Sequence, residues 1–230
     1  MGQDVSERAG DASSELPPTF IFELDWASAN ERTEIAERMT GLKRQTMNLR
    51  VMPHARLLRV RACEDDHRLV GWAGLDVDFT PGIAEVFSLY VLPEYRTYLV
   101  GIILETARAT FLRQRGASRV LVRMESATNT SLLRYRVRER LIIEAPRPEI
   151  PSDTVRLCTQ CELYGEHCTS QAYFWVDLAA FLERGLKRLG CAIEIDALPQ
   201  RIVLDPRQFR STRRALHPDG PIVGHGSDDV

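Results

Sequence analysis

The spacing of apolar residues changes several times between positions 55 and 125, and each change marks a predicted element. Short apolar or alternating runs at 55–62, 69–77 and 83–91, separated by turn residues, predict three strands. Strands this close in sequence pair as an antiparallel meander. A helical period follows over 99–114. The run RVLVRM at 119–124 then predicts a strand that returns to the sheet parallel to its neighbour, because a crossover helix requires it.

The flanking patterns complete the outline of one domain. Residues 1–18 are polar and predict a disordered leader, and residues 206–230 predict a flexible tail. Between them, 19–205 is expected to form a single α/β domain with a Cys-rich insertion at about 150–171. Its other predicted elements are a strand at 19–23, helices at 30–47, 130–141 and 174–189, and strands at 192–196 and 201–204.

The junction at Ile83–Ile103 is the most informative stretch. An apolar strand ends at the polar sequence Pro93-Glu94-Tyr95-Arg96, and an apolar helix follows with Gly101 near its start. The first amides of a helix have no partner within the helix, and the helix dipole is positive there. This junction therefore predicts an anion site that suits the pyrophosphate of a large cofactor.

Composition excludes several other classes of protein. The 230 residues carry 30 Lys and Arg against 32 Asp and Glu, so the net charge of −2 gives no reason to expect nucleic-acid binding. No apolar run is long enough to span a bilayer, and no signal-peptide pattern starts the chain, so we expect a cytoplasmic protein. Five cysteines, three of them within eleven positions, are not typical of a secreted disulfide framework in a chain of this length.

The order of elements and the sequence VLPEYR resemble the GNAT acyltransferase superfamily. The resemblance covers about residues 55–141 and is strongest where VLPEYR is similar to the family's V-x-P-x-Y/F-R at the end of a strand. The family's [RQ]-x-x-G-x-[GA] loop follows, with Arg96 as the leading residue and Gly101 as the closing one. Leu99 stands where the family has its first glycine, and Tyr98 stands where many members have a second arginine. Less free approach of the backbone to phosphate is the expected consequence.

The resemblance implies a mixed α/β sheet that binds acetyl-CoA or another acyl-CoA. In this fold two central parallel strands splay, and the exposed backbone of the first pairs with the pantetheine arm. The implied cofactor-binding residues are Leu89, Tyr90 and Val91 on the strand; Arg96, Thr97, Tyr98, Leu99, Val100, Gly101 and Ile102 at the pyrophosphate; and Asn129 after the second parallel strand.

The same resemblance suggests two catalytic residues, each with a plainer alternative. Glu85 is similar to the family's water-linked general base, or it is a solvated residue on the other face of its strand. The amide of Val91 would polarise the thioester carbonyl. Tyr135 is the candidate general acid, but it lies six residues after Asn129 where the family has seven, and Arg136 holds the seventh place. A shift of one residue turns a helical side chain by about 100°, so Tyr135 is alternatively a surface or core residue.

A second candidate site is the Cys-rich segment. Cys158, Cys161, His167 and Cys168 offer soft ligands at spacings that suit one tetrahedral zinc ion, with Cys191 and Cys63 as other choices for the fourth ligand. Free buried or redox-active thiols and an iron–sulfur cluster are the alternatives. If zinc binds, we expect a structural role.

The sequence therefore predicts an N-acyltransferase that moves an acetyl or longer acyl group from acyl-CoA to an amine by direct attack in a ternary complex. One alternative is a non-catalytic acyl-CoA sensor or interaction module, and another is an enzyme whose donor is an acyl carrier protein. A third makes the Cys-rich segment a redox or metal sensor. The long C-terminal region would shape the acceptor pocket or form the interface of a homodimer. No residue identifies the amine acceptor.

Overall fold

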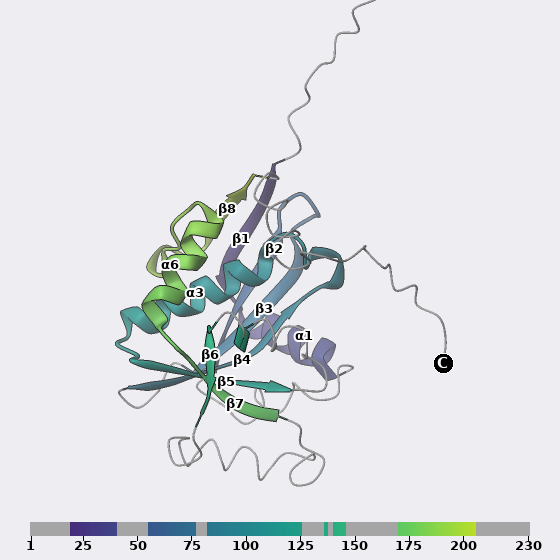
Figure 1. Ribbon diagram of the computed structural model, residues 1–230. Helices are drawn as coiled ribbons and strands as arrows, with labels where there is room; N and C mark the ends of the chain where they lie inside the picture. The colour runs from purple at the N-terminus through teal and green to yellow at the C-terminus, as the bar shows by residue number, and fades with distance from the viewer. Residues whose placement is uncertain are drawn as a thin grey trace, which may run out of the picture.

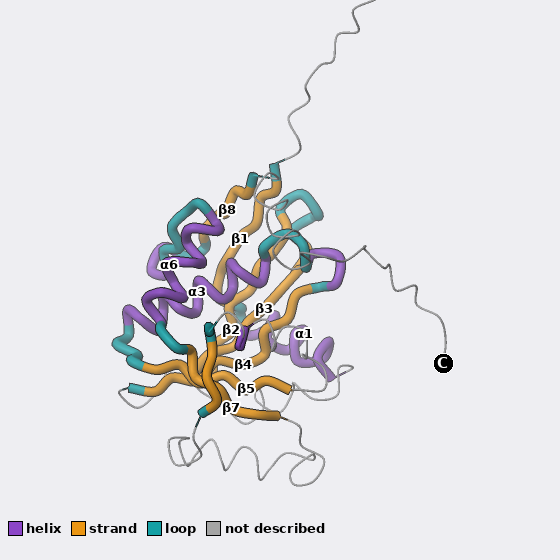
Figure 2. The backbone as a smooth tube through the Cα atoms, viewed as in Figure 1, coloured by secondary structure: helices purple, strands orange, loops and turns teal. Residues whose placement is uncertain are grey.

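The computed structural model describes residues 19–40, 55–76, 82–125, 136–137, 140–145 and 170–205. They form one eight-stranded sheet in the order β6-β7-β5-β4-β3-β2-β1-β8, with helices against both faces (Figures 1 and 2). This architecture confirms the predicted mixed α/β fold. The predicted leader, the tail and almost all of the Cys-rich insertion lie outside the described residues. The strands are β1 (Phe20–Trp26), β2 (Ala55–Ala62), β3 (Arg68–Asp76), β4 (Ile83–Val91), β5 (Arg119–Glu125), β6 (Ile142–Glu144), β7 (Ser170–Trp175) and β8 (Gln200–Leu204).

The helices are α1 (Ala29–Thr40), α3 (Val100–Gln114) and α6 (Leu178–Leu189), with short 3₁₀ turns η1 (Pro93–Tyr95) and η3 (Ile195–Ala197). The central part of the chain follows the prediction closely. Strands β2, β3 and β4 form the expected antiparallel meander, and α3 crosses over so that β5 lies parallel to β4. The sheet and its crossover helix therefore follow from the apolar pattern.

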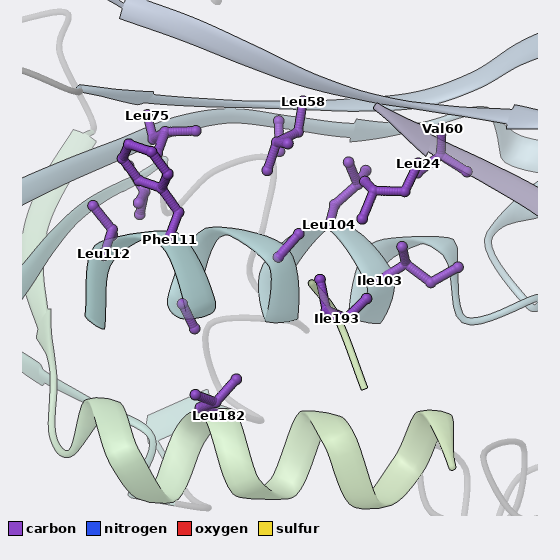
Figure 3. Packing of buried hydrophobic residues seen from close by; sticks show 14 of the residues in the cluster. Leu24, Leu58, Val60, Leu75, Ile103, Leu104, Phe111, Leu112, Leu182 and Ile193 are labelled. Atoms are coloured by element: carbon purple, nitrogen blue, oxygen red, sulfur yellow. The ribbon is translucent and has the colours of Figure 1, made fainter. Parts of the chain in front are cut away.

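Helix α3 is buried on two sides, because it lies between the sheet and α6 (Figure 1). Leu104 and Phe111 point from α3 toward the strands, and Leu182 points from α6 toward α3 (Figure 3). Helix α1 packs on the opposite face, where Ile35 joins a second apolar cluster with Trp72 and neighbouring residues of β2 and β3. The two faces of the sheet are thus covered by different helices.

Strand β4 carries a bulge opposite Ala73. Trp72 pairs with Tyr90 and Gly74 pairs with Phe87, so two residues of β4, Ser88 and Leu89, stand against one residue of β3. Ser88 has the left-handed φ of 51°. A bulge of this kind shifts the alternation of side chains by one position. As a result, Leu89 and Val91 pack with the α3 cluster, as Ala84 and Val86 do before the bulge.

Near the C-terminus two predictions are wrong. Phe174 and Trp175 were expected in a helix but end β7, whose aromatic side chains are buried. The helix starts at Leu178 instead, because the Asp177 carboxylate accepts from the Ala180 amide at 3.0 Å and caps it. The predicted strand at 192–196 is extended chain leading into η3. Strand β8 does complete the sheet, beside β1.

Two other helices differ from their predicted bounds. Helix α1 is described to Thr40, and the rest of the predicted helix to 47 lies outside the described residues. In the predicted helix at 130–141, Arg136 and Val137 are helical, but Arg140 and Leu141 are not, and β6 follows directly.

Candidate acyl-donor site

The parallel strands β4 and β5 separate partway along their length. They pair only over Ile83–Val86 and Arg119–Val122, although β4 continues to Val91 and β5 to Glu125. Past this point β5 pairs with β7 on its other side, and no described strand pairs with the β5-facing edge of Phe87–Val91. An extended chain could add to this edge by backbone hydrogen bonds, as in strand addition. The splaying of the two parallel strands that the resemblance implies is therefore confirmed in the backbone, and we call the opening between them the wedge.

The chain leaving this wedge leads directly into the start of α3. Leu99 adopts the left-handed conformation, with φ 59° and ψ 8°, and its side chain does not cap the helix. Its carbonyl accepts from the amides of Ile102 and Ile103. Among the described residues nothing accepts from the amides of Leu99, Val100 or Gly101. These amides, together with the positive end of the helix dipole, form a group suited to phosphate oxygens.

The side chain of Leu99 is buried in the core, at 3% exposure, rather than pointing outward to solvent. Its backbone nevertheless has the left-handed conformation, which only glycine adopts without strain. A glycine, the residue that the family has at this place, would therefore fit this backbone. At Gly101, an added Cβ would have only an ordinary contact, 3.8 Å from Val91 Cγ2. The loop thus has a left-handed backbone at 99, where a glycine would be unstrained, and an uncrowded glycine at 101.

The turn before α3 is held by contacts with the β2–β3 turn. The Tyr95 hydroxyl donates to Asp65 at 2.7 Å, and Arg68 pairs with Glu94 at 2.8 Å. Partial burial, together with the bond to the Asp65 carboxylate, raises the pKa of Tyr95 to about 12. The neutral phenol therefore remains a donor at every physiological pH, which keeps η1 in place.

Arg96, the predicted leading residue of the pyrophosphate loop, folds back on the strand. Its Nε donates to the Val91 carbonyl at 3.3 Å, and its Cζ lies 6.0 Å from the ring centre of Tyr90. Tyr98 packs against Phe20, with ring centres 4.7 Å apart. The aromatic side chain at 98 is thus used for packing, and Thr97 is exposed beside it.

Glu85 is buried, at 7% exposure, and its Cα lies opposite Leu121 of β5. Its neighbours Ala84 and Val86 pack toward α3, so Glu85 faces the other side of the sheet. Beyond the bulge, Tyr90 lies on that same side and stacks on Trp72 with ring centres 4.7 Å apart. The alternative of a solvated Glu85 does not fit this burial.

Sequence reasoning missed a buried ionic cluster beneath the bulge. Oε1 of Glu105 accepts from Arg108 at 2.8 Å and from Arg136 at 2.7 Å, and all three side chains are buried. Arg108 also donates to two backbone carbonyls, those of Gly74 and Phe87. Burial tends to raise the pKa of Glu105, but the two guanidinium groups outweigh it and lower the pKa. The only sequence signal was the i, i+3 spacing of Glu105 and Arg108, which usually marks an exposed pair.

Several predicted site residues lie outside the described residues. They are Asn129, Tyr135, Cys158, Cys161, His167 and Cys168. Within the described part of the chain, no group of three or more Cys, His, Asp or Glu side chains could hold a metal ion. Cys63 and Cys191 are partly buried free thiols. The zinc site therefore stays a prediction. No described helix is long and apolar enough to cross a membrane.

Similarity to known proteins is found both for the sequence family and for the fold. The model of the acetyltransferase (GNAT) family matches residues 20–135, about half of the chain. No curated protein sequence matches. Among solved structures, an acetyltransferase of the GNAT family from Staphylococcus aureus Mu50 has a TM-score of 0.50 at 12% identity, covering 68% of this chain and 99% of its own.

Two further structures are similar over much the same span. An acetyltransferase from Streptococcus agalactiae has a TM-score of 0.48 at 11% identity, covering 67% of this chain and 97% of its own. A spermidine N-acetyltransferase variant from Vibrio cholerae has a TM-score of 0.48 at 11% identity, covering 71% and 97%. The family match, which spans the splayed parallel strands and the start of α3, shows that this protein belongs to the GNAT family of acyl-CoA-dependent N-acetyltransferases.

Proposed function

We propose that the protein transfers an acetyl or longer acyl group from acyl-CoA to an amine by direct attack in a ternary complex. The observation that carries this proposal is the early end of β4–β5 pairing at Val86 and Val122. It leaves the edge of β4 open to the amide groups of pantetheine. The amides of Leu99–Gly101 follow at the end of this edge, where the pyrophosphate would arrive.

The retained loop geometry favours coenzyme A as the donor over an acyl carrier protein. A carrier protein brings a single phosphate on its pantetheine arm, whereas coenzyme A brings a pyrophosphate that can use several amides and the helix dipole. Leu99 keeps the left-handed backbone that presents these amides, although a leucine pays a strain cost there. A carrier-protein donor, with its single phosphate, would not require this group of amides.

Glu85 is the proposed general base, acting on the amine through water. It is buried on the face of the sheet away from α3, three residues before the bulge. The amide of Leu89, the second residue of the bulge, is the proposed donor to the thioester carbonyl. A strand rises about 3.3 Å per residue, so Val91 lies about 20 Å along the chain from Glu85, too far for both to serve one reacting centre. We therefore assign this role to Leu89, and Val91 to the pantetheine arm.

A non-catalytic acyl-CoA sensor is the second candidate, and one observation favours it. The place that the family gives to its acid tyrosine, seven residues after Asn129, belongs here to Arg136, which is buried and paired with Glu105. A guanidinium does not give up a proton at neutral pH, so Arg136 cannot act as the acid toward the leaving thiolate. Tyr135 remains the proposed acid of the enzyme.

The experiment separates the two candidates by measuring binding and turnover on the same sample. Isothermal titration calorimetry with acetyl-CoA measures affinity, and release of free coenzyme A thiol in the presence of a panel of primary amines and polyamines measures transfer. The enzyme predicts binding together with amine-dependent thiol release. Binding without release for any amine would favour the sensor. Absence of acetyl-CoA binding would contradict both.

A further inference from the structure

The guanidinium of Arg108 lies under the bulge of β4. Its Nη1 donates to the Phe87 carbonyl at 3.1 Å and to the Gly74 carbonyl at 3.2 Å. Phe87 and Gly74 pair with each other in the β3–β4 ladder, directly before the bulge. The next two residues of β4, Ser88 and Leu89, stand opposite the single residue Ala73. Arg108 therefore ties β3 to β4 at the point where the ladder becomes irregular.

The same side chain is linked to the opposite flank of the wedge. Its Nη2 donates to Glu105, which in turn accepts from Arg136, a residue of the segment that follows β5. The cluster thus connects α3, the bulge of β4 and the chain beyond β5.

Burial of these three charged side chains costs desolvation free energy. Arg108 has 1% exposure and Glu105 has 5%, and the three side chains together carry a net charge of +1. In addition, Nε of Arg108 and Oε2 of Glu105 are buried and have no hydrogen-bond partner among the described residues. Apolar residues of similar volume usually stabilise such a place as well or better. A stability role alone therefore gives no reason for these residues.

We propose that Arg108 is a positioning residue that holds the bulge of β4 and so aims the backbone of Leu89–Val91 at the acyl-pantetheine arm. The inference rests on the proposed function. Without Arg108, two buried carbonyls lose their donor, and the strand gains by returning to regular pairing with β3. A shift of one residue turns every later side chain and backbone group to the opposite side. The edge that receives pantetheine would then point away from the wedge, while the amides at the start of α3 would stay in place.

Loss of Arg108 should thus affect binding of pantetheine at β4 but not binding of the pyrophosphate at α3. A purely structural role would not give this difference, so the two effects are measured separately. Calorimetry is done with two probes, coenzyme A and 3′-phospho-ADP, the nucleotide half of coenzyme A that lacks pantetheine. The variants are Arg108→Met, which removes the donor, and Arg108→Lys, which retains a charge and can reach one carbonyl. Thr106→Val is the matched control, since Thr106 is buried on the same helix and its hydroxyl has no hydrogen-bond partner in the described part of the chain.

For Arg108→Met we expect coenzyme A affinity to fall about tenfold or more and 3′-phospho-ADP affinity to stay within about twofold. Arg108→Lys is expected to show the same selectivity with a smaller loss, and it serves alone if Arg108→Met does not fold. Thr106→Val should bind both probes as the parent does. Equal loss of both probes, or no loss of either, would overturn the inference while leaving the proposed function intact. A parent protein that binds neither probe would overturn the proposed function and the inference with it.

Discussion

The phenyl ring of Phe87 lies directly against the backbone of Gly74 on the neighbouring strand. A Cβ at Gly74 would overlap the ring carbons Cε2 and Cδ2, so no side chain fits there without moving the ring. Because Phe87 is buried and ends the regular part of β4, movement of its ring would disturb the bulge. We predict that Gly74→Ala lowers the free energy of unfolding by about 1–3 kcal/mol, measured by urea denaturation.

A matched substitution separates this steric effect from a general effect of alanine. At Gly101 an added Cβ meets only Val91, at an ordinary 3.8 Å, and the position lies in the first turn of α3. Gly101→Ala should therefore leave stability unchanged or raise it by up to about 1 kcal/mol. Equal destabilisation by both substitutions would contradict this account of Gly74.

Because the backbone of Leu99 is left-handed, we predict that a glycine variant at this position is more stable than an alanine variant, the reverse of the usual order in a helix. Leu99→Ala and Leu99→Gly both remove a buried side chain and should each cost about 2–5 kcal/mol. With φ at 59°, however, the glycine variant should be the more stable by about 1 kcal/mol, since alanine keeps the strain. Thermal or urea unfolding of the two variants measures the difference. An alanine variant that is as stable as the glycine variant would mean that the residue is not left-handed in solution.

Glu31 predicts a pH-dependent part of the stability. Its carboxylate accepts from the Ser28 amide at 2.8 Å and from Arg61 at 2.7 Å, and these bonds outweigh the effect of burial and lower its pKa from 4.5 to about 2. A lowered pKa in the folded state stabilises the fold above pH 4.5, and this contribution is lost as the pH falls toward 2. Glu31→Gln should cost about 2–3 kcal/mol at pH 7 and progressively less below pH 4.5.

Urea unfolding at pH 7 and at pH 3 measures this difference for the parent and the variant. The control is Glu34→Gln on the same helix, because Glu34 is 43% exposed and pairs with Arg38 at the surface. It should cost less than about 0.5 kcal/mol at pH 7. A Glu31→Gln effect of the same size at both pH values would contradict the assignment.

Glu85→Gln tests the proposed general base. We expect kcat at neutral pH to fall about 100-fold, while the acetyl-CoA dissociation constant changes little, because Glu85 faces away from the edge that receives pantetheine. Activity should recover partly at higher pH, where the acceptor amine loses its proton unaided. Glu183→Gln, an exposed residue of α6, is the control and should keep full activity. Unchanged turnover in Glu85→Gln would remove Glu85 from the mechanism.

The sequence was sufficient for the part of the fold that forms the wedge. The bounds of β2 and β4 are as predicted, and so are the parallel return of β5 and the antiparallel meander. These elements are recognisable because each is a short apolar or alternating run bounded by turn residues.

The sequence was less informative where tertiary contacts override the local pattern. Tyr173, Phe174 and Trp175 lie just before the apolar residues of α6. The predicted helix at 174–189 therefore included the last two residues of a buried strand. The signal that could have separated them is Asp177, an N-cap residue directly before Leu178. Tyr173, Phe174 and Trp175 are all buried, so the end of β7 shows no alternation of apolar and polar residues.

The ionic cluster could not be found from sequence for a related reason. Arg108 lies on the side of α3 that faces the sheet, where it donates to the carbonyls of Gly74 and Phe87, and its i, i+3 spacing from Glu105 gives no sign that both side chains are buried. Helix α3 is also covered by α6 on its other side. Gly185 of α6 packs so closely on Thr106 that a Cβ there would overlap its hydroxyl. Periodicity reports one buried face, whereas a helix held between two layers has two.

The central claim is that the edge of β4 past the bulge and the first amides of α3 together receive acyl-CoA. Hydrogen–deuterium exchange with and without saturating acetyl-CoA tests it most directly, with β1 as the reference segment. The account predicts slowed exchange of the Leu89–Val91 and Leu99–Gly101 amides and no change in Phe20–Trp26. Binding of acetyl-CoA that leaves both segments unprotected would contradict it.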